Sequence, residues 1–326
     1  MHTEAIRIAY ADETNYACGN NSVSTVKYAS KPFGAGEAAD LTVMNAPYSS
    51  SPSLGIPEVE RKKLRPIGRG ANYVKALDVG YNYKEFTYTH AIQNDTWIQL
   101  AVQCAAGAIP ASKVFHCEIP GVDGAMDYFD IVGVVLQKYE LKMGDGNDWP
   151  TETITFLYYD VVDSVAVTDL LEVTDAQPTV KAGISMWVTA TEADVAITAL
   201  EATDLYSDLS VMNLSVENTL IDKKIASKHL RQDPTLKFRD VSGDAEFTTD
   251  TVGILGDSIA RNGTLTAITL YDIYVQITGT ANHLRMAEMY CKTDSIGEIP
   301  DTTENIMFKT EFEQGGNCRF VYGAKT

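Results

Sequence analysis

The sequence has no long apolar run, few cysteines and few basic residues. None of its 326 residues belongs to an apolar run of about 18 residues, the length that a membrane-spanning helix needs, so we expect no membrane insertion. The opening residues have neither a basic start nor an apolar centre, which is unlike a signal peptide. The 5 cysteines are scattered without a Cys-x-x-Cys pair, so we expect small buried thiols and synthesis in a reducing compartment.

The shortage of basic residues gives the chain a strongly negative charge. It has 26 Lys and Arg against 44 Asp and Glu, a formal net charge of −18. A surface this negative repels nucleic-acid phosphates. Two interpretations fit: simple solubility, or a surface past which DNA slides without binding.

Motifs that carry catalysis are also missing. The sequence has no Gly-x-Ser-x-Gly elbow, Walker loop, dinucleotide fingerprint or His-Glu-x-x-His. His116-Cys117-Glu118 looks like the start of a zinc-deaminase site, but no Pro-Cys-x-x-Cys follows. His90 lies in an alternating segment, which indicates a packed or surface histidine. We therefore predict no catalytic residue, no metal site and no cofactor, and we expect that the chain is not an enzyme.

The segment from Gly133 to Asp160 contains a cluster of Asp, Gly and Asn at 145–148 that could start a calcium loop. The positions that should continue an EF-hand loop hold Trp149, Pro150 and Phe156, which excludes one. Apolar residues instead alternate with polar ones on both sides of the cluster, which predicts a β-hairpin. The residues expected on its buried face are Val135, Tyr139, Leu141, Met143, Ile154, Phe156 and Tyr158.

Other segments predict further strands and one helix. Alternation in "YKEFTYTH", "VMNLSVEN", "TLTAITLYDIYVQITG" and "NIMFKTEFE" is typical of strands, and the β-branched content of "ISMWVTATEADVAITALEA" favours strands there too. In "NDTWIQLAVQCAAG", the residues Ile98, Leu100, Val102 and Cys104 would suit a strand. Asn94 or Asp95, however, can cap a helix that Gly107 ends, with Trp97, Ala101 and Ala105 on one face, and we favour the helix.

The order of these elements occurs twice. Glu85-Phe86-Thr87, a polar cap, a short helix and a glycine are echoed by Glu246-Phe247-Thr248 and the segment that follows it, and alternating strands come next in both halves. We therefore predict a mainly β protein with two tandem domains, 1–164 and 183–326, each with a short flanking helix. Residues 165–182, which include Pro178, form the predicted connection.

Residues 30–70 have little periodicity and are rich in Pro, Gly and Ser, which predicts a long loop inside the first domain. The loop ends in a basic cluster, the residues Arg61, Lys62, Lys63, Arg65 and Arg69. These residues could form a solvated charge run. Alternatively, they could dock on the acidic surface of a neighbouring copy and make an inter-subunit or inter-ring contact.

Four segments resemble the tail tube (major tail) proteins of long-tailed bacterial and archaeal viruses. "IRIAYADETNYACG" is similar to a Tyr-x-x-Glu-Thr/Ser-x-Tyr-x-x-Gly start in that family. "YNYKEFTYTHAIQNDTWIQLAVQCAAG" resembles its strand followed by a helix, and "YFDIVGVVLQKYELKMGDGNDWPTETITF" its Gly-led hairpin. "VMNLSVENTLIDKK" resembles the strand that opens the second part. The early loop with its basic end has no counterpart that we can match.

The resemblance implies two β-sandwich or partial-barrel domains in a structural protein of the virion tail, synthesised in the host cytoplasm. Copies would form rings of three or six that stack into a hollow tube around a tape-measure protein, bounded by terminator and tip proteins. Viral DNA would pass through the lumen without specific binding. The alternative is a two-domain β-sandwich binding or adhesin module for a carbohydrate or protein ligand.

Overall fold

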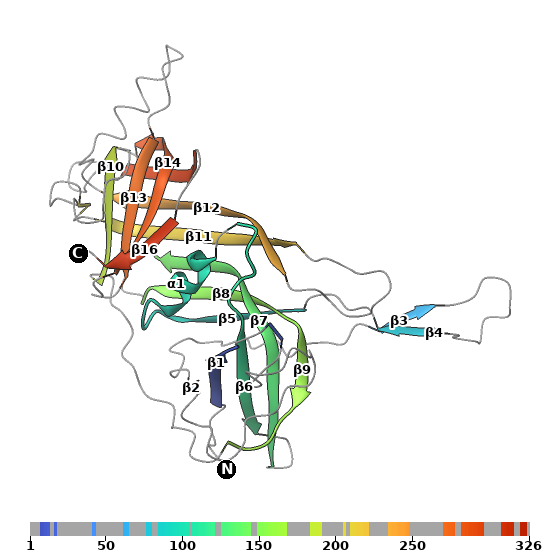
Figure 1. Cartoon of the computed structure of the whole chain (residues 1–326). Helices are drawn as coiled ribbons and strands as arrows, with labels where there is room; N and C mark the ends of the chain where they lie inside the picture. Colours follow the sequence, from blue (N-terminus) through green and yellow to red (C-terminus); the bar gives the residue numbers. More distant parts are fainter. Residues whose placement is uncertain are drawn as a thin grey trace.

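The computed structural model describes seventeen stretches of the chain. They are 7–13, 16–17, 41–43, 61–64, 76–79, 84–104, 106–120, 125–144, 149–167, 183–190, 205–206, 209–221, 234–247, 270–277, 282–296, 308–315 and 320–324. Within them the protein is mainly β, as predicted, with one helix (Figure 1).

The elements of the first half are β1 (Arg7–Asp12), β2 (Thr42–Val43), β3 (Arg61–Leu64), β4 (Ala76–Val79), β5 (Lys84–Ala91), α1 (Thr96–Gln103), β6 (Lys113–Pro120), β7 (Met126–Met143), β8 (Thr151–Tyr158) and β9 (Asp160–Asp163). Those of the second half are β10 (Ile184–Ala190), β11 (Leu209–Ile221), β12 (Thr235–Phe247), β13 (Leu270–Ile277), β14 (Asn282–Ile296), β15 (Phe308–Gln314) and β16 (Phe320–Ala324).

Fourteen of these strands form one antiparallel sheet that runs through both halves. Its main path is β10-β13-β14-β15-β12-β11-β7-β6-β1-β2, while β5, β8, β9 and β16 pair beside this path. The two halves meet where Lys138–Met143 of β7 pair with Met212–Glu217 of β11. Strands β3 and β4 pair only with each other among the described strands, and their hairpin stands apart from the sheet (Figure 1).

The same pairing order occurs in each half. In the first half β1 pairs with β6, β6 with β7, β7 with β8, and β8 with β5. In the second half β10 pairs with β13, β13 with β14, β14 with β15, and β15 with β12. The short strands that follow, β9 and β16, pair with β7 and β14 respectively. Because the matching strands also follow one another in the same chain order, each half contains the same arrangement of six strands.

The predicted hairpin is confirmed as β7 and β8, although Val135, which is buried as expected, lies on the opposite face from the other residues. Tyr139, Leu141 and Met143 are buried in the main core with Ile154, Phe156 and Tyr158. Val135 is buried in a second, smaller core. The register shifts between Leu136 and Lys138, and this bulge moves Leu136 to the face on which Tyr139 lies. The cluster at 145–148 lies outside the described residues.

Helix α1 is confirmed at Thr96–Gln103, and Trp97 and Ala101 are buried on its inner face together with Ile98 and Val102. The prediction that Gly107 ends the helix was wrong, because the backbone is already extended at Cys104. Asn94 contributes the local polar contact at its start, because its Oδ1 accepts a hydrogen bond from the backbone N–H of Thr96 at 3.1 Å. The second predicted helix lies outside the described residues.

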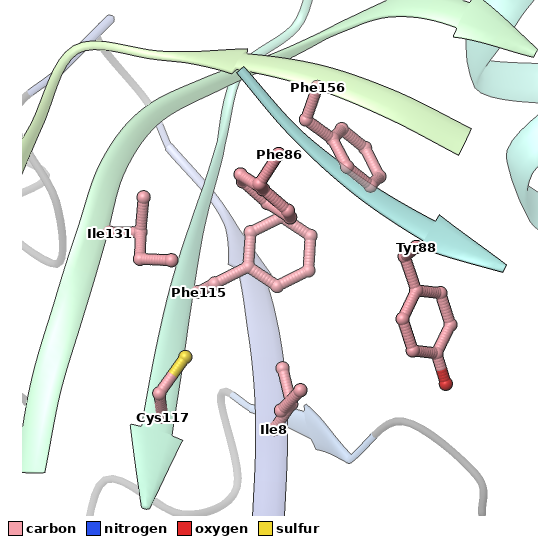
Figure 2. A pocket seen from close by; sticks show the side chains of 7 residues that line it. All are labelled: Ile8, Phe86, Tyr88, Phe115, Cys117, Ile131 and Phe156. Atoms are coloured by element: carbon pink, nitrogen blue, oxygen red, sulfur yellow. The ribbon is translucent and has the colours of Figure 1, made fainter. Parts of the chain in front are cut away.

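The main core is continuous across the halves. Aromatic rings fill it in the first half: Phe115 of β6 contacts Phe86 of β5 at 5.8 Å and Phe156 of β8 at 5.4 Å between ring centroids. The sheet therefore folds back at β7, so that β6 faces β5 and β8 (Figure 2). In the second half, Tyr206 packs on Phe247 at 4.5 Å.

Glu13 joins the opening segment to β7. Its carboxylate accepts hydrogen bonds from the backbone N–H groups of Ala17 and Gly133, each at 3.1 Å. Gly133 has φ +65°, and a Cβ there would lie 2.6 Å from Cβ of Tyr159, so only glycine fits without displacement. The ring of Tyr16 packs edge-on against that of Tyr159 at 5.8 Å. Two segments that are far apart in the sequence are thus fastened at one point.

Candidate assembly surface

A six-strand part of the sheet has one polar face. Its strands are ordered β5-β8-β7-β11-β12-β15, and their inward residues form the main core. Because directly opposed residues in neighbouring strands lie on the same face, the registers identify the residues of the other face. The registers also place Ala91, Val135, Leu157, Val211, Thr219 and Phe238 on this face. We name the other residues, all of them polar, the polar sheet face: Glu85, Thr87, Thr89, Thr151, Thr153, Thr155, Lys138, Glu140, Lys142, Asn213, Ser215, Glu217, Asp240, Ser242, Asp244, Glu246, Lys309, Glu311 and Glu313.

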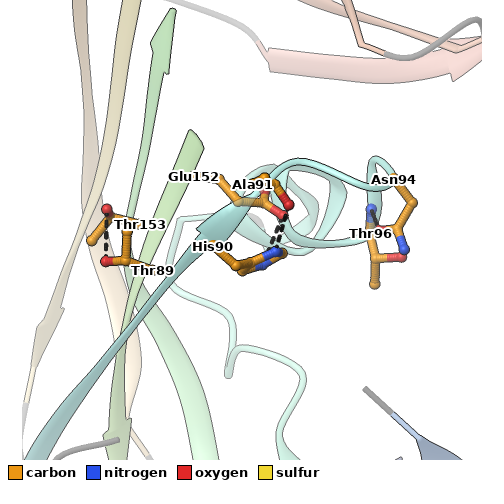
Figure 3. Close-up of polar contacts among 7 residues, drawn as sticks. All are labelled: Thr89, His90, Ala91, Asn94, Thr96, Glu152 and Thr153. Carbon is orange, nitrogen blue, oxygen red and sulfur yellow. Dashed lines mark hydrogen bonds and ion pairs between the residues drawn. The ribbon is translucent and has the colours of Figure 1, made fainter. Parts of the chain in front are cut away.

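Hydroxyl groups cover one end of the polar sheet face. The hydroxyls of Thr87 and Thr155 lie 3.4 Å apart. Those of Thr89 and Thr153, which Figure 3 shows, lie 3.0 Å apart. Threonine suits this position because its branched side chain favours the strand while its hydroxyl remains polar. Apart from Glu85, this end of the face is therefore polar without being charged.

Carboxylates dominate the remainder of the polar sheet face. They outnumber the lysines, and two of the three lysines have acidic neighbours. Nζ of Lys138 lies 3.1 Å from Oε1 of Glu140, and Nζ of Lys309 lies 3.9 Å from Oδ2 of Asp244. Asn213 donates to Oδ2 of Asp244 at 3.0 Å. A hollow of about 300 Å³ beside Asp244, Glu311 and Glu313 adds to this acidic region. The net effect is a face that repels polyanions.

The candidate basic cluster lies partly within the described residues. Arg61, Lys62 and Lys63 belong to β3, opposite Val79, Asp78 and Leu77 of β4. Arg65 and Arg69 lie outside the described residues. The hairpin that carries the described part of the cluster stands apart from the sheet (Figure 1).

A buried acid–histidine pair connects β5 to β8. His90 and Glu152 are directly opposed, with Nε2 of His90 3.0 Å from Oε1 of Glu152 (Figure 3). Nδ1 of His90 lies 2.8 Å from the carbonyl oxygen of Ala91. Burial raises the pKa of the Glu152 carboxyl, and the hydrogen bond from His90 opposes this rise. Burial, and then the nearby Glu152, raise the pKa of Tyr88 to about 12. Of the two settings predicted for His90, packed or surface, the structure shows the packed one.

A second buried polar group contains the sequence His116-Cys117-Glu118. Nδ1 of His116 lies 2.7 Å from Oδ1 of Asp130, which is directly opposed on β7. An Arg7 guanidinium nitrogen on β1 lies 2.7 Å from Oε2 of Glu118, again in directly opposed positions. Each pair joins directly opposed residues of neighbouring strands, which is a structural role that stabilises the sheet. In the described part of the chain, no group of three His, Cys, Asp or Glu side chains is placed to hold a metal ion.

The apolar pocket between β5, β6 and β8 offers no room for a ligand. It is lined by Ile8, Phe86, Tyr88, Phe115, Cys117, Ile131 and Phe156 (Figure 2). Its lining leaves no space for a group as large as a water molecule. The pocket is therefore an ordinary part of the core. Burial raises the pKa of the Cys117 thiol well above its usual range, so Cys117 stays protonated at neutral pH.

The tryptophans and cysteines differ in burial. Trp97 is buried and Trp187 packs against His283 at 5.2 Å between ring centroids, while Trp149 is 50% exposed just before β8. Cys117 and Cys291 are buried, as expected, whereas Cys104 is only partly buried. Cys18 and Cys318 lie outside the described residues.

Comparison with known proteins gives no family for the chain. No protein-family model matches its sequence, and no curated protein matches it well enough to count as a relative. Among the described residues, no helix has the length and hydropathy to cross a bilayer.

Proposed function

We propose that this chain is a structural subunit that assembles with identical copies into stacked rings, forming the hollow tail tube of a long-tailed virus. The polar sheet face is the observation that carries this proposal. It extends without interruption across both halves, is backed by one core, and carries more carboxylates than lysines. A tube wall needs such a face, because a DNA molecule must pass it without adhering.

The repeated pairing order supports two tandem tube-like domains, 1–164 and 183–326, with 165–182 as the connection. Each half supplies three strands to the polar sheet face: β5, β8 and β7 from the first, and β11, β12 and β15 from the second. A chain with two equivalent domains can form a ring of three with pseudo-six-fold symmetry, or a ring of six.

Contacts near the opening segment also support the family resemblance. Glu13 and Tyr16 belong to the Tyr-x-x-Glu-Thr-x-Tyr start, and Gly133 leads the resembling hairpin. In the structure Glu13 bonds to Gly133, and Tyr16 packs beside it on Tyr159. Residues from two of the resembling segments are therefore in direct contact in the structure.

The basic cluster on the β3–β4 hairpin, which includes Arg61, Lys62 and Lys63, provides a contact to a neighbouring copy. A basic hairpin standing apart from an acidic body is electrostatically complementary to the body of another copy. In the assembled tail, the further partners would be the tape-measure protein inside the tube and the terminator and tip proteins at its ends. None of these contacts requires a cofactor or a catalytic residue.

The alternative binding module is favoured by one observation, the exposed aromatic residues Trp149 and Phe238, which are 50% and 42% exposed. They lie at opposite ends of the six-strand region, however, because Trp149 precedes the pair Thr151–Lys142 while Phe238 lies beyond the pair Lys138–Glu217. Two aromatic rings so far apart do not make one sugar-stacking platform.

Mass photometry of the purified chain over a range of concentrations, combined with a glycan array, tests the proposal. Tube function predicts discrete rings that give way to longer assemblies as concentration increases, with no glycan signal. A monomer at every concentration together with a specific glycan signal would establish the alternative instead.

A further inference from the structure

A β-bulge at the same place in each half allows the two halves to be matched residue by residue. In the first half the β6–β7 register shifts at a bulge that contains Gly133 and lies opposite Val114. In the second half the β13–β14 register shifts at a bulge that contains Glu288 and lies opposite Asp272. Gly133 and Glu288 both have positive φ, +65° and +58°. Positions in the two halves can therefore be matched by counting from these two residues.

The count passes from β7 and β14 to the strands beside them. Leu136 on β7 and Cys291 on β14 each lie three residues after the matched bulge position. Leu136 is directly opposed to Phe156 on β8, and Cys291 is directly opposed to Phe312 on β15. Both phenylalanines are buried in the main core. The registers therefore match β8 to β15 at these two residues.

The buried acid–histidine pair of the first half corresponds to an apolar pair in the second. Four residues before the matched phenylalanines, β8 has Glu152 and β15 has Phe308. The residues directly opposed to them are His90 on β5 and Phe247 on β12. The rings of Phe247 and Phe308 stack with their centroids 6.1 Å apart. The fold therefore accepts two apolar rings at a position where the first half buries a carboxyl group and an imidazole.

Stability alone does not explain the acid–histidine pair. His90 is 5% exposed and Glu152 is 1% exposed, so both groups have lost their contact with water. A buried pair of ionisable groups is often no more stabilising than apolar side chains that fill the same space. The property that the pair has, and that two phenylalanines lack, is the ability to bind and release protons.

The geometry fixes how many protons the closed pair holds. Nδ1 of His90 lies 2.8 Å from the carbonyl oxygen of Ala91, which can only accept, so Nδ1 carries a proton. Nε2 of His90 faces Oε1 of Glu152 at 3.0 Å. One further proton on either of these two atoms makes the pair neutral overall. A second further proton would leave a buried positive charge, and the loss of both would leave a buried negative charge, and burial opposes each.

The groups around the pair do not balance a charge on Glu152. The ring of Tyr88 lies 4.7 Å from that of His90, the hydroxyl of Tyr139 faces the carboxyl group, and Asp95 lies at the start of α1. None of these facing groups, all within the described residues, is cationic. Burial raises the pKa of the Glu152 carboxyl, the hydrogen bond from His90 opposes this rise, and the negative charge of Asp95 adds to it. This direction agrees with a site that retains its proton.

We propose that the His90–Glu152 pair is a pH-sensitive latch, which holds the end of β5 and the start of α1 on β8 in mildly acidic solution and lets them separate as the solution becomes alkaline. The pair belongs to the end of the β5–β8 ladder, and the N–H of Ile92 beyond it donates to the carbonyl oxygen of Pro150 at 2.9 Å. Figure 3 shows the pair beside the start of α1. The inference goes beyond the proposed function and does not depend on tube assembly.

Proton linkage gives the direction of the response. When the latch opens, the exposed glutamic acid and histidine titrate near their ordinary values of about 4.3 and about 6.5. Between these values the open pair holds as many protons as the closed pair, so pH has no effect on opening. Above about 6.5, opening releases a proton, and the opening constant increases by up to about tenfold per pH unit. Below about 4.3, opening takes up a proton, and the opening constant increases as the pH falls.

Hydrogen exchange followed by mass spectrometry between pH 5 and pH 9 tests the latch, with each amide corrected for its intrinsic exchange rate. Segment 84–92 contains the latch, and segment 241–247 is its match in the second half. In the wild type, the protection of 84–92 should stay constant up to a pH of about 6.5 and then fall by up to about tenfold per pH unit. The protection of 241–247 should not change, because Phe247 and Phe308 bind no protons.

Two variants test whether Glu152 causes the response. Glu152→Gln has no carboxyl proton to lose, so its segment 84–92 should not respond above a pH of about 6.5. Below that value its protection should fall, because the exposed histidine takes up a proton that the closed site excludes. The double variant His90→Phe with Glu152→Phe copies the pair of the second half and should respond at neither end. If the double variant does not fold, Glu152→Gln alone decides.

Either of two results would overturn the latch. One is an alkaline response that persists in Glu152→Gln. The other is a wild type in which segments 84–92 and 241–247 respond to pH in the same way. Neither result concerns ring formation, so failure of the latch and failure of the tube function are distinguishable.

Discussion

Arg239 on β12 donates from Nε to Oδ1 of Asn218 on β11 at 2.8 Å, and the same guanidinium holds the end of helix α1. Its two terminal nitrogens donate to the carbonyl oxygens of Val102 at 3.1 Å and Cys104 at 2.8 Å. Asn218 in turn donates to the carbonyl oxygen of Ala101 at 3.1 Å. A charged residue of the second half thus satisfies the carbonyl groups that the helix leaves without internal partners.

Replacing Arg239 should weaken the junction of the two halves. Arg239→Met keeps the aliphatic length but removes every donor, leaving helix carbonyls unsatisfied, so we expect a loss of about 3 kcal/mol in the free energy of unfolding. Lys237→Met is the matched control on the same strand, an exposed position where the change should stay within about 0.5 kcal/mol. Urea unfolding followed by tryptophan fluorescence measures both, and equal losses in the two variants would show that the Arg239 contacts contribute nothing.

Alanine substitutions at Gly133 and Gly107 distinguish the cost of backbone strain from the cost of steric overlap. Both have positive φ, +65° and +81°, but a Cβ at Gly133 would meet Tyr159 and Ala17, whereas at Gly107 it would meet nothing within 4 Å. Gly107→Ala should therefore cost only the backbone term, about 1–2 kcal/mol. Gly133→Ala adds the cost of displacing packed atoms, about 2–5 kcal/mol in all. Thermal unfolding of the two variants gives the comparison, and a Gly133 variant no less stable than the Gly107 variant would refute the close packing around Glu13.

Glu152 gives the fold a specific pH dependence. Because burial raises its folded-state pKa above the ordinary value of about 4.3, the neutral carboxyl stabilises the fold below that value. This contribution is lost as the pH rises through the folded pKa. Glu152→Gln remains neutral and keeps a planar polar group beside Nε2 of His90, so the variant should gain stability relative to the wild type as the pH rises from about 4.

Chemical unfolding at a series of pH values from acidic to neutral checks this sign. The comparison needs the difference between the two proteins at each pH, because other acidic groups titrate in both. A difference that does not change with pH, or one that favours the wild type more as the pH rises, would contradict a raised pKa at Glu152.

Reversing the charge of the basic cluster should weaken assembly without unfolding the subunit. With Arg61, Lys62, Lys63 and Arg65 all changed to Glu, attraction to an acidic neighbour becomes repulsion. We expect the concentration needed for tube formation to rise about tenfold, equivalent to about 1.4 kcal/mol. The thermal midpoint of the monomer should not change. An unchanged distribution of tube lengths in micrographs would rule out this role for the cluster.

The sequence predicted local elements well where one pattern decided the structure. Alternation correctly indicated β5, the β7–β8 hairpin and β11, and Trp97 with Ala101 correctly indicated the face of α1. Val135 was misplaced because a bulge after Leu136 changes the parity of the strand, and no local residue preference reveals a bulge of this kind.

Local sequence patterns could not predict which strands pair with each other or in which register. The His90–Glu152 and Arg7–Glu118 pairs bring together residues 62 and 111 positions apart, and only the strand register shows that they are opposed. The junction of β7 with β11, and hence the continuous polar sheet face, depends on such registers throughout. The repeated order of elements was visible in the sequence, but the matching pairing network needed the structure.

Electron microscopy of the purified wild-type chain, with class averages taken down the assembly axis, tests the central claim most directly. The account predicts closed rings of three or six chains around an open bore, stacked into tubes at high concentration. Images that contain only compact single particles without a central hole, at the same concentrations, would contradict it.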